Sequence, residues 1–338
     1  MKGCILLYII FLLFNCYPSQ AQEKALPKRG DGIVTFLRRH NRSEAVYQKE
    51  FIELNKGKFG KNNTLQWGVA YQLPPLKTQT ASAPSPKKPS SSPKKKQEPL
   101  FGKNLASYEI LSTELKGACF YVVCGHGGPD PGAIGKMGKY ELHEDEYAYD
   151  ISLRLARNLL MRGALVYIII QDAQDGIREE RILKNSKRET CMGSRIPLNQ
   201  IERLNQRSNK INALYHKDKP AYSRAIFIHI DSRSKHKSTD VFFYHSNSRE
   251  SRSLALTMRN TFSQKYRIHQ PNRGFTGYVE HRKLHVLNKT QPTSLFVELG
   301  NIQNSYDQQR IVLNNNRQAL ANWLCEGFIL DYKHSRKK

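Results

Sequence analysis

Residues 118–135 read ACFYVVCGHGGPDPGAIG, and they join two patterns that together indicate an α/β fold. The first seven residues are continuously apolar, as in a strand that is covered on both faces of its sheet. His126 follows among glycines and prolines, which mark a turn. Open α/β sheets place their sites beyond the carboxyl ends of the strands. This stretch therefore predicts a buried strand that delivers His126 to such a site.

The chain repeats this alternation of apolar runs and amphipathic segments as far as residue 334. Further strands are expected at 164–170, 225–230, 241–244 and 294–297, and helices at 144–161, 201–215, 251–266 and around 320–330. Strands that alternate with helices predict an α/β domain over residues 107–334. Its central sheet is expected to be twisted and mostly parallel or mixed, with helices on both faces.

Two segments near the N-terminus are expected to lie outside any core. Lys2, an apolar run over 5–14 and small residues ending at Ala21 predict a secretory signal peptide over residues 1–21. The run is too short to span a bilayer comfortably, so we expect no stable membrane insertion. Residues 76–106 begin in a Pro-, Ser- and Lys-rich stretch and predict an extended linker. The protein is therefore expected to be exported, to the periplasm or the cell envelope.

Residues 24–75, between the signal and the linker, predict a small α+β module. Apolar residues recur at helical spacing over 33–37 and 51–54, and they alternate as in a strand over 69–73. The order of these segments resembles a lysin-motif (LysM) module, a family that binds the N-acetylglucosamine-containing glycan of cell walls. Without that resemblance, the pattern fits any small helical module with one strand.

Charge and cysteine content narrow the classes of function. A formal net charge of +25 favours binding to an anionic partner, such as nucleic acid, an anionic membrane or an acidic envelope polymer. Export argues against nucleic acid as a partner. The cysteines beyond the signal peptide contain no C-x-x-C pair, so no zinc-finger or disulfide framework is indicated, and they are expected to be buried thiols. These cysteines are Cys119, Cys124, Cys191 and Cys325.

Three predicted strands end in side chains that can do chemistry: His126, His229 and Glu298. An acidic cluster over 141–146 opens the helix that follows the glycine-rich turn. Two imidazoles and a carboxylate are the ligand set of a catalytic zinc site, which leaves a fourth position for water. The other interpretation is that the histidines are hydrogen-bonded core residues and that the acidic cluster stabilises the helix N-terminus. Spacing alone leaves both interpretations open.

Five blocks of the chain resemble, in order, the type 3 family of zinc-dependent N-acetylmuramoyl-L-alanine amidases. The blocks are GHGGPDPGAIG (125–135), EDEYAYDISLRLARNL (144–159), LNQRSNKIN (204–212), FIHIDS (227–232) and VLNKTQPTSLFVELGNIQN (286–304). The resemblance spans residues 118–332. It implies hydrolysis of the amide bond between N-acetylmuramic acid and L-alanine in peptidoglycan, with Zn²⁺ as the cofactor. It identifies no activator protein.

The resemblance also implies roles for individual residues. His126, Glu144 and His229 match the zinc ligands, and Glu298 matches the catalytic carboxylate. Arg207 and Asn212, on the helix expected at 201–215, match residues that we interpret as structural support.

Two departures from the family pattern stand out. Val123 and Cys124 replace the usual Asp-Pro before the glycine-rich turn, which predicts that His126 lacks an orienting carboxylate. The segment 171–200 is long, and it is expected to be either a lid or a surface loop with a short helix. The first departure keeps an alternative function open, namely a non-catalytic peptidoglycan-binding protein with a decayed amidase fold.

Overall fold

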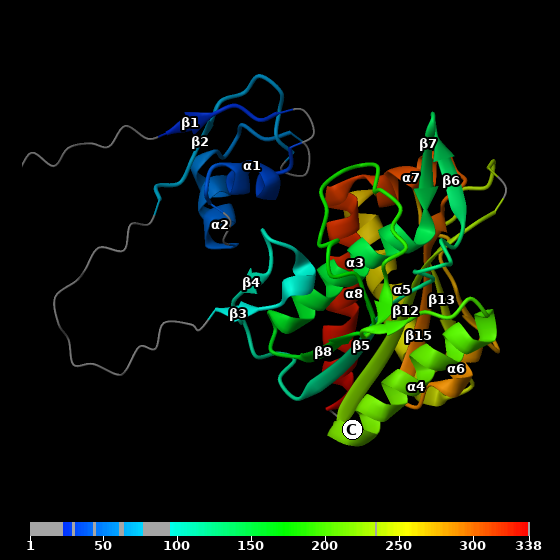
Figure 1. Cartoon of the computed structure of the whole chain (residues 1–338). Helices are drawn as coiled ribbons and strands as arrows, with labels where there is room; N and C mark the ends of the chain where they lie inside the picture. Colours follow the sequence, from blue (N-terminus) through cyan, green and yellow to red (C-terminus); the bar gives the residue numbers. More distant parts are fainter. Residues whose placement is uncertain are drawn as a thin grey trace, which may run out of the picture. The chain divides into compact units, whose positions relative to one another are not determined.

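The computed structural model of this chain describes residues 23–28, 31–42, 45–60, 64–76, 95–233 and 235–336. It contains two compact units, residues 1–90 and residues 91–338 (Figure 1). The described part of each unit has its own buried hydrophobic cluster. The predicted signal peptide and residues 77–94 of the predicted linker lie outside the described residues.

A six-stranded mixed sheet forms the centre of the larger unit. In order across the sheet, the strands are β14 (Val279–His281), β13 (Phe242–His245), β15 (Thr293–Asn301), β12 (Tyr222–Asp231), β5 (Ala118–Cys124) and β8 (Leu165–Ile168). Only the β13–β15 pairing is antiparallel, and the other four pairings are parallel. The predicted α/β fold with a mostly parallel, mixed sheet is thereby confirmed.

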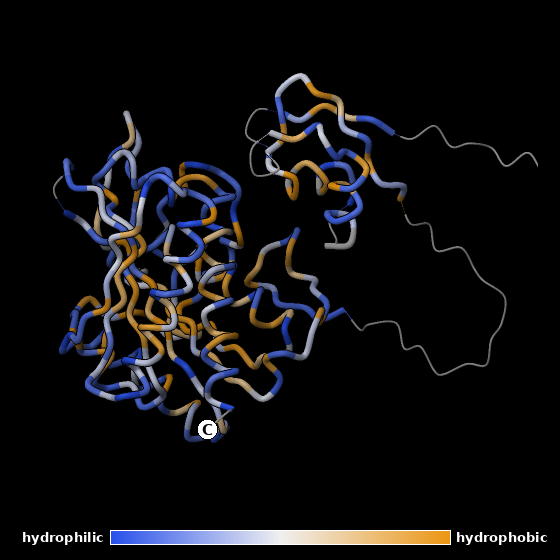
Figure 2. Tube along the Cα trace, turned by 180° about the vertical axis from the view of Figure 1, so that it is seen from behind, coloured by the Kyte–Doolittle hydropathy of each residue, from blue (hydrophilic) through white to orange (hydrophobic). Residues whose placement is uncertain are grey.

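Helices cover both faces of this sheet (Figure 1). On one face pack α3 (Glu144–Leu160), α5 (Arg249–His269) and α8 (Asn314–Ser335), and on the other lie α4 (Gln200–Asp218) and α6 (His285–Lys289). A further helix, α7 (Ser305–Val312), packs against β15 and α8. All seven residues of β5 are buried, as its unbroken apolar run predicts. Hydrophobic segments accordingly concentrate in the interior of this unit, and hydrophilic ones on its outside (Figure 2).

The segment after β8 forms a small sheet where the sequence suggested a short helix. Here β9 (Ile170–Gln171), β10 (Thr190–Cys191) and β11 (Ser194–Arg195) pair in the order β11-β10-β9. Residues 172–199 are all described and contain no helix, so the expected helix is wrong. Part of the segment instead forms a two-residue turn between β10 and β11, where Met192 and Gly193 both have positive φ. That turn closes a β-hairpin.

The C-terminal part of the predicted linker belongs to the larger unit. Strand β3 (Lys96–Gln97) pairs with β4 (Ser107–Tyr108), and η2 (Pro99–Phe101) lies between them. Phe101 is 1% exposed and packs into the large core. The linker predicted for 76–106 therefore overlaps this unit over residues 95–106, because Phe101, with Leu100 and Leu105 beside it, anchors the segment to the core.

The smaller unit consists of β1 (Lys24–Ala25), α1 (Ile33–Arg39), α2 (Ala45–Leu54) and β2 (Tyr71–Gln72), with β1 and β2 antiparallel. The side chain of Asn55, just beyond α2, links this helix to β2. Its Nδ2 donates to the Gln72 carbonyl over 2.8 Å, and its Oδ1 accepts from the Gln72 amide over 2.7 Å. A core of mostly aromatic residues closes the unit, and its assignment to the LysM family stays a prediction. That core contains Phe36, Leu37, Tyr47, Phe51, Tyr71 and Leu73.

Candidate active site

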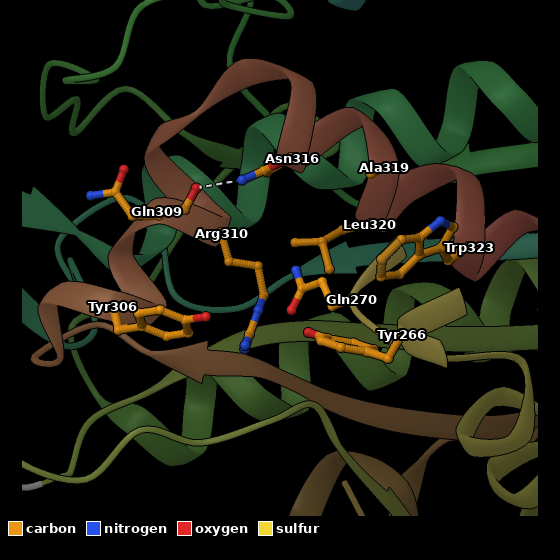
Figure 3. Close-up of a pocket in the computed structure, with 9 residues that line it drawn as sticks. All are labelled: Tyr266, Gln270, Tyr306, Gln309, Arg310, Asn316, Ala319, Leu320 and Trp323. Atoms are coloured by element: carbon orange, nitrogen blue, oxygen red, sulfur yellow. Dashed lines mark hydrogen bonds between the residues drawn. The ribbon is translucent and has the colours of Figure 1, made fainter. Parts of the chain in front are cut away.

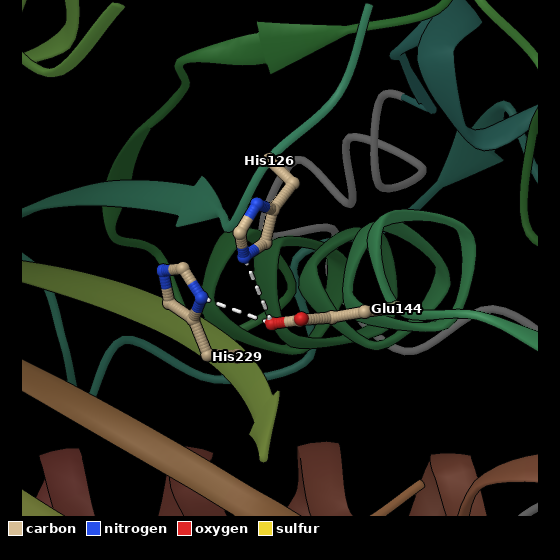
Figure 4. A group of neighbouring side chains, drawn as sticks. All are labelled: His126, Glu144 and His229. Carbon is tan, nitrogen blue, oxygen red and sulfur yellow. Dashed lines mark hydrogen bonds and ion pairs between the residues drawn. The ribbon is translucent and has the colours of Figure 1, made fainter. Parts of the chain in front are cut away.

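The carboxyl ends of the central strands bring His229 together with two side chains, His126 and Glu144, that lie at least 85 residues before it in the sequence. His126 follows β5, His229 lies near the end of β12, and Glu144 is the first residue of α3. One donor atom from each of these three residues lies within 4.8 Å of the other two. Figure 4 shows both imidazole rings turned toward the same carboxylate oxygen of Glu144. The structure therefore gathers the three residues that the resemblance implied as metal ligands.

Backbone groups hold the Glu144 carboxylate between the two rings. Its Oε1 lies 3.3 Å from Nε2 of His126 and 3.0 Å from Nδ1 of His229. The amide of Ile230 donates to Oε1 over 3.0 Å, and the amide of Ala133 donates to Oε2 over 2.8 Å. Burial works to raise the pKa of Glu144, but the hydrogen bonds from the two histidines outweigh it and hold the pKa below its usual range.

A carboxylate does orient His126, although it does not come from the position where the family has Asp-Pro. Oδ2 of Asp130 lies 2.9 Å from Nδ1 of His126 and also accepts from Nη2 of Arg203 over 2.7 Å. The expectation that His126 lacks such a partner is therefore wrong. The sequence does contain a signal for the contact between Asp130 and His126, since Asp130 stands four residues after His126 in the same turn. Arg203, in contrast, lies 73 residues after Asp130.

The two remaining family positions, Arg207 and Asn212, which we interpreted as structural support, both make hydrogen bonds to the backbone. Arg207 is buried and donates from Nη2 to the His126 carbonyl. Asn212 bridges the end of α6 to the start of the next segment, since its Nδ2 donates to the Lys289 carbonyl and its Oδ1 accepts from the Gln291 amide, each over 2.8 Å. Arg207 thus supports the turn that carries His126, and Asn212 lies farther out.

Two glycines of the turn are required because the site residues approach the backbone closely. A Cβ at Gly125 would lie 2.3 Å from Cε1 of His229, and a Cβ at Gly132 would lie 2.6 Å from Oε2 of Glu144. Both separations are well inside van der Waals contact. His126 itself has φ of 61°, a left-handed conformation that is uncommon outside glycine.

The two histidines differ in environment. The His229 ring stacks on Phe296 with centroids 4.2 Å apart, and burial lowers its pKa. Burial works to lower the pKa of His126 too, but the hydrogen bonds to Asp130 and Glu144 outweigh it and raise the pKa to about 10. A metal ion at this site therefore competes with a proton on His126.

Glu298 completes the cluster from β15. It lines a cavity of about 310 Å³ together with His126 and His229. Its Oε2 is buried without a hydrogen-bond partner among the described residues. Burial, and then the negative charges of Glu144 and Asp231, raise its pKa well above the usual range. Such a carboxylate accepts a proton more readily than an exposed one.

The donor set fits a transition metal. Two imidazole nitrogens and one carboxylate oxygen match a three-ligand catalytic zinc site. Cys124 lines the same cavity, but burial raises the pKa of its thiol, so it stays neutral and is not one of the three grouped donors. All four cysteines beyond the predicted signal peptide are buried and free.

Beside the candidate metal ligands lies a cluster of three buried acidic residues, Asp145, Glu146 and Glu189. Glu146 pairs with Nη1 of Arg178 over 2.7 Å, and Oε2 of Glu189 accepts from the Gly128 amide over 2.8 Å. Burial, and then the charges of Glu146 and Glu189, raise the pKa of Asp145 to about 8. The Glu189 contact ties the glycine-rich turn to the segment before β10.

The fold and the site first define the class: a mixed α/β protein with a candidate metal site at its strand ends. The family model described as N-acetylmuramoyl-L-alanine amidase matches residues 121–329, more than half of the chain. This chain therefore belongs to the N-acetylmuramoyl-L-alanine amidase family, whose substrate is peptidoglycan.

The chain is also similar, at low identity, to solved structures of amidases. AmiC2 of Nostoc punctiforme is 20% identical, with a TM-score of 0.45, and the match covers 66% of this chain and 99% of the AmiC2 chain. Ami1 from Mycobacterium smegmatis is 17% identical, with a TM-score of 0.47, and covers 64% and 97%. CwlD from Clostridioides difficile, solved in complex with the GerS lipoprotein, is 15% identical, with a TM-score of 0.47, and covers 64% and 98%. A comparison with curated proteins found no match.

Proposed function

We propose that this protein is a zinc-dependent amidase that hydrolyses the amide bond between the lactyl group of N-acetylmuramic acid and the L-alanine of the stem peptide. One observation supports the proposal above others: His126, Glu144 and His229 offer donor atoms within 4.8 Å of one another, and Glu298 lines the cavity beside them. Zinc is the cofactor that suits nitrogen and carboxylate donors in a hydrolytic site.

In this proposal each residue has a distinct role. His126, Glu144 and His229 hold the metal, and Asp130 orients His126. When bound, zinc supplies a Lewis acid that lowers the pKa of a water molecule. Glu298 takes a proton from the attacking water and delivers it to the departing amine of L-alanine, so that one C–O bond forms and one C–N bond breaks. The raised pKa of Glu298 makes it a better proton acceptor than an ordinary carboxylate.

The remainder of the chain would bring the enzyme to its substrate. A signal peptide over residues 1–21 would export it to the periplasm or cell envelope. A LysM-like module over 24–75 would bind glycan, and the linker would keep the catalytic unit at a high effective concentration near the wall. Among the described residues, no helix has the length and apolarity to cross a membrane.

A digest of purified peptidoglycan tests the proposal. The full chain without residues 1–21, loaded with zinc, should release stem peptides that begin with a free L-alanine amine, as read by mass spectrometry. Metal analysis on the same sample should find about one zinc per chain, one for the single three-donor site. Zinc-loaded protein that releases no such peptide would contradict the proposed activity.

The alternative is a non-catalytic peptidoglycan-binding protein with a decayed amidase fold. Its ground in the sequence is the replacement of Asp-Pro by Val123 and Cys124, but Asp130 supplies an orienting carboxylate to His126 from another position. Metal-free protein that sediments with sacculi, and that gains no activity with zinc, would support this alternative over the amidase.

A further inference from the structure

A second cavity, of about 200 Å³, lies between α5, α7 and α8, on the face of the sheet opposite α4 and α6 (Figure 3). None of the described residues that line it also lines the candidate active-site cavity. Its volume is below the roughly 300–1,000 Å³ of pockets for drug-sized ligands, so it suits one small ring rather than an extended peptide.

Aromatic side chains form much of its wall. Tyr306, in the first turn of α7, is 62% exposed. Trp323 of α8 packs edge-on against Tyr266, with centroids 5.5 Å apart, and against Phe262 at the same separation. A single exposed tyrosine needs no explanation by itself. This one borders a cavity whose other aromatic rings are already held in place by packing.

The charge in the cavity is compensated within the protein. Nη1 of Arg310 donates to the Thr239 carbonyl over 2.9 Å and to the Leu299 carbonyl over 3.2 Å. Its Nη2 lies 3.5 Å from Oδ1 of Asp307 and 3.6 Å from Oδ1 of Asp240. Asp240 also pairs with Nη2 of Arg273 over 2.6 Å, so two carboxylates face two guanidinium groups and their charges cancel. The cavity therefore has no strong preference for an anion.

The other polar groups are neutral. Figure 3 shows the hydroxyls of Tyr266 and Tyr306 pointing toward the Arg310 guanidinium from opposite sides, with the Gln270 amide between them and Leu320. Hydroxyl and amide groups can each donate and accept hydrogen bonds. Such groups suit a ligand that is itself rich in hydroxyl or acetamido groups.

We propose that this cavity binds one neutral sugar ring of a glycan chain. The C–H face of a pyranose packs against an exposed aromatic ring, whose π face is electronegative. Its hydroxyls and acetamido group match the neutral donors and acceptors of the cavity, and its size matches one ring. This site is separate from the amide-hydrolysing site, and the inference goes beyond the proposed function. It gives the catalytic unit its own contact with glycan.

The chain contains two tryptophans, Trp67 in the smaller unit and Trp323 at this cavity. In a Trp67→Phe variant of the full chain, intrinsic fluorescence therefore reports on Trp323 alone.

The probe is the β-1,4-linked tetramer of N-acetylglucosamine, which has no lactyl–peptide amide to hydrolyse. We expect a saturable fluorescence change. Tyr306→Ala and Gln270→Ala, each in this background, should weaken binding by about tenfold, as expected for one lost aromatic contact or hydrogen bond.

Tyr140→Ala is the matched control, since Tyr140 is a 48% exposed tyrosine that lines neither cavity. It should leave the titration unchanged, and circular dichroism checks that each variant is folded. No saturable change with the tetramer would overturn the proposal, as would full retention of the change in both cavity variants. A response to stem peptide but not to the sugar would also overturn it and assign a peptide site. Because the readout is fluorescence with an uncleavable probe, these outcomes are independent of amidase activity.

Discussion

His229 and Glu298 are register partners on the neighbouring parallel strands β12 and β15, and both line the same cavity. The pairing then shifts between His229 and Asp231, so the regular ladder ends at the site. A slip of one residue would turn one of the two side chains to the other face of the sheet. The strand register therefore sets the distance between a proposed metal ligand and the proposed general base.

Replacing Glu298 with glutamine should remove activity without removing the metal. The amide keeps the shape of the side chain but cannot accept the proton, so we expect the rate of stem-peptide release to fall roughly 10²–10⁴-fold. Metal content and melting temperature should stay close to those of the unaltered protein. Glu280→Gln, at an exposed carboxylate of β14, is the control and should retain full activity. Loss of zinc in Glu298→Gln would instead make Glu298 a ligand.

The contact between Asp130 and His126 should determine metal affinity. Asp130→Asn removes the charge that orients His126 and raises its basicity, so zinc affinity should fall about 10–100-fold. Competition with a chelator measures this affinity. Asp175→Asn is a matched control, because the two aspartate side chains are equally exposed at 24% and both pair with arginine. Equal zinc affinity in the two variants would show that Asp130 has no orienting role.

Adding one methyl group at Gly125 should disrupt the site by steric contact alone. The Cβ of Gly125→Ala would meet the His229 ring at 2.3 Å, so the ring must leave its position. Zinc content and activity should both fall sharply. Gly32→Ala is the control, since nothing lies within 4 Å of its added Cβ. A crystal structure of Gly125→Ala with an undisplaced His229 ring would contradict this explanation.

Asp145 should make the stability of the protein depend on pH. Its pKa is about 8 in the folded protein, because of burial and then the charges of Glu146 and Glu189, against 3.8 when unperturbed. Between these values the folded protein binds more protons than the unfolded chain, so the free energy of unfolding falls as pH rises. Below pH 4 both states are protonated and the effect vanishes.

The variant Asp145→Asn should therefore be more stable than the unaltered protein at pH 8, on the order of 3 kcal/mol, and equally stable near pH 4. The new amide can keep the contact from the Glu146 amide through its Oδ1. Denaturant titrations at both pH values measure the difference. Glu141→Gln is the control, because that side chain is 54% exposed and should show no gain. Equal gains at pH 4 and pH 8 would point to packing rather than ionisation.

Local patterns in the sequence determined much of this protein. The unbroken apolar run of β5, the 3–4 spacing of α3 and the strand-end positions of His126, His229 and Glu298 could all be predicted, because burial imposes a period that each segment shows by itself. The four site residues could be grouped from the sequence only through resemblance to a family. Spacing alone did not show whether the acidic cluster and the strand-end residues form a metal site or are structural.

Only the tertiary structure decided which distant segments meet. It supplied Arg203 to Asp130 across 73 residues, replaced an expected helix with the β10–β11 hairpin, and packed Phe101 of the predicted linker into the core. It also showed why Gly125 must be glycine: the His229 ring occupies the space of its missing side chain. Periodic burial is a property of one segment, whereas these contacts depend on how several segments pack together. For that reason no single stretch of sequence contains them.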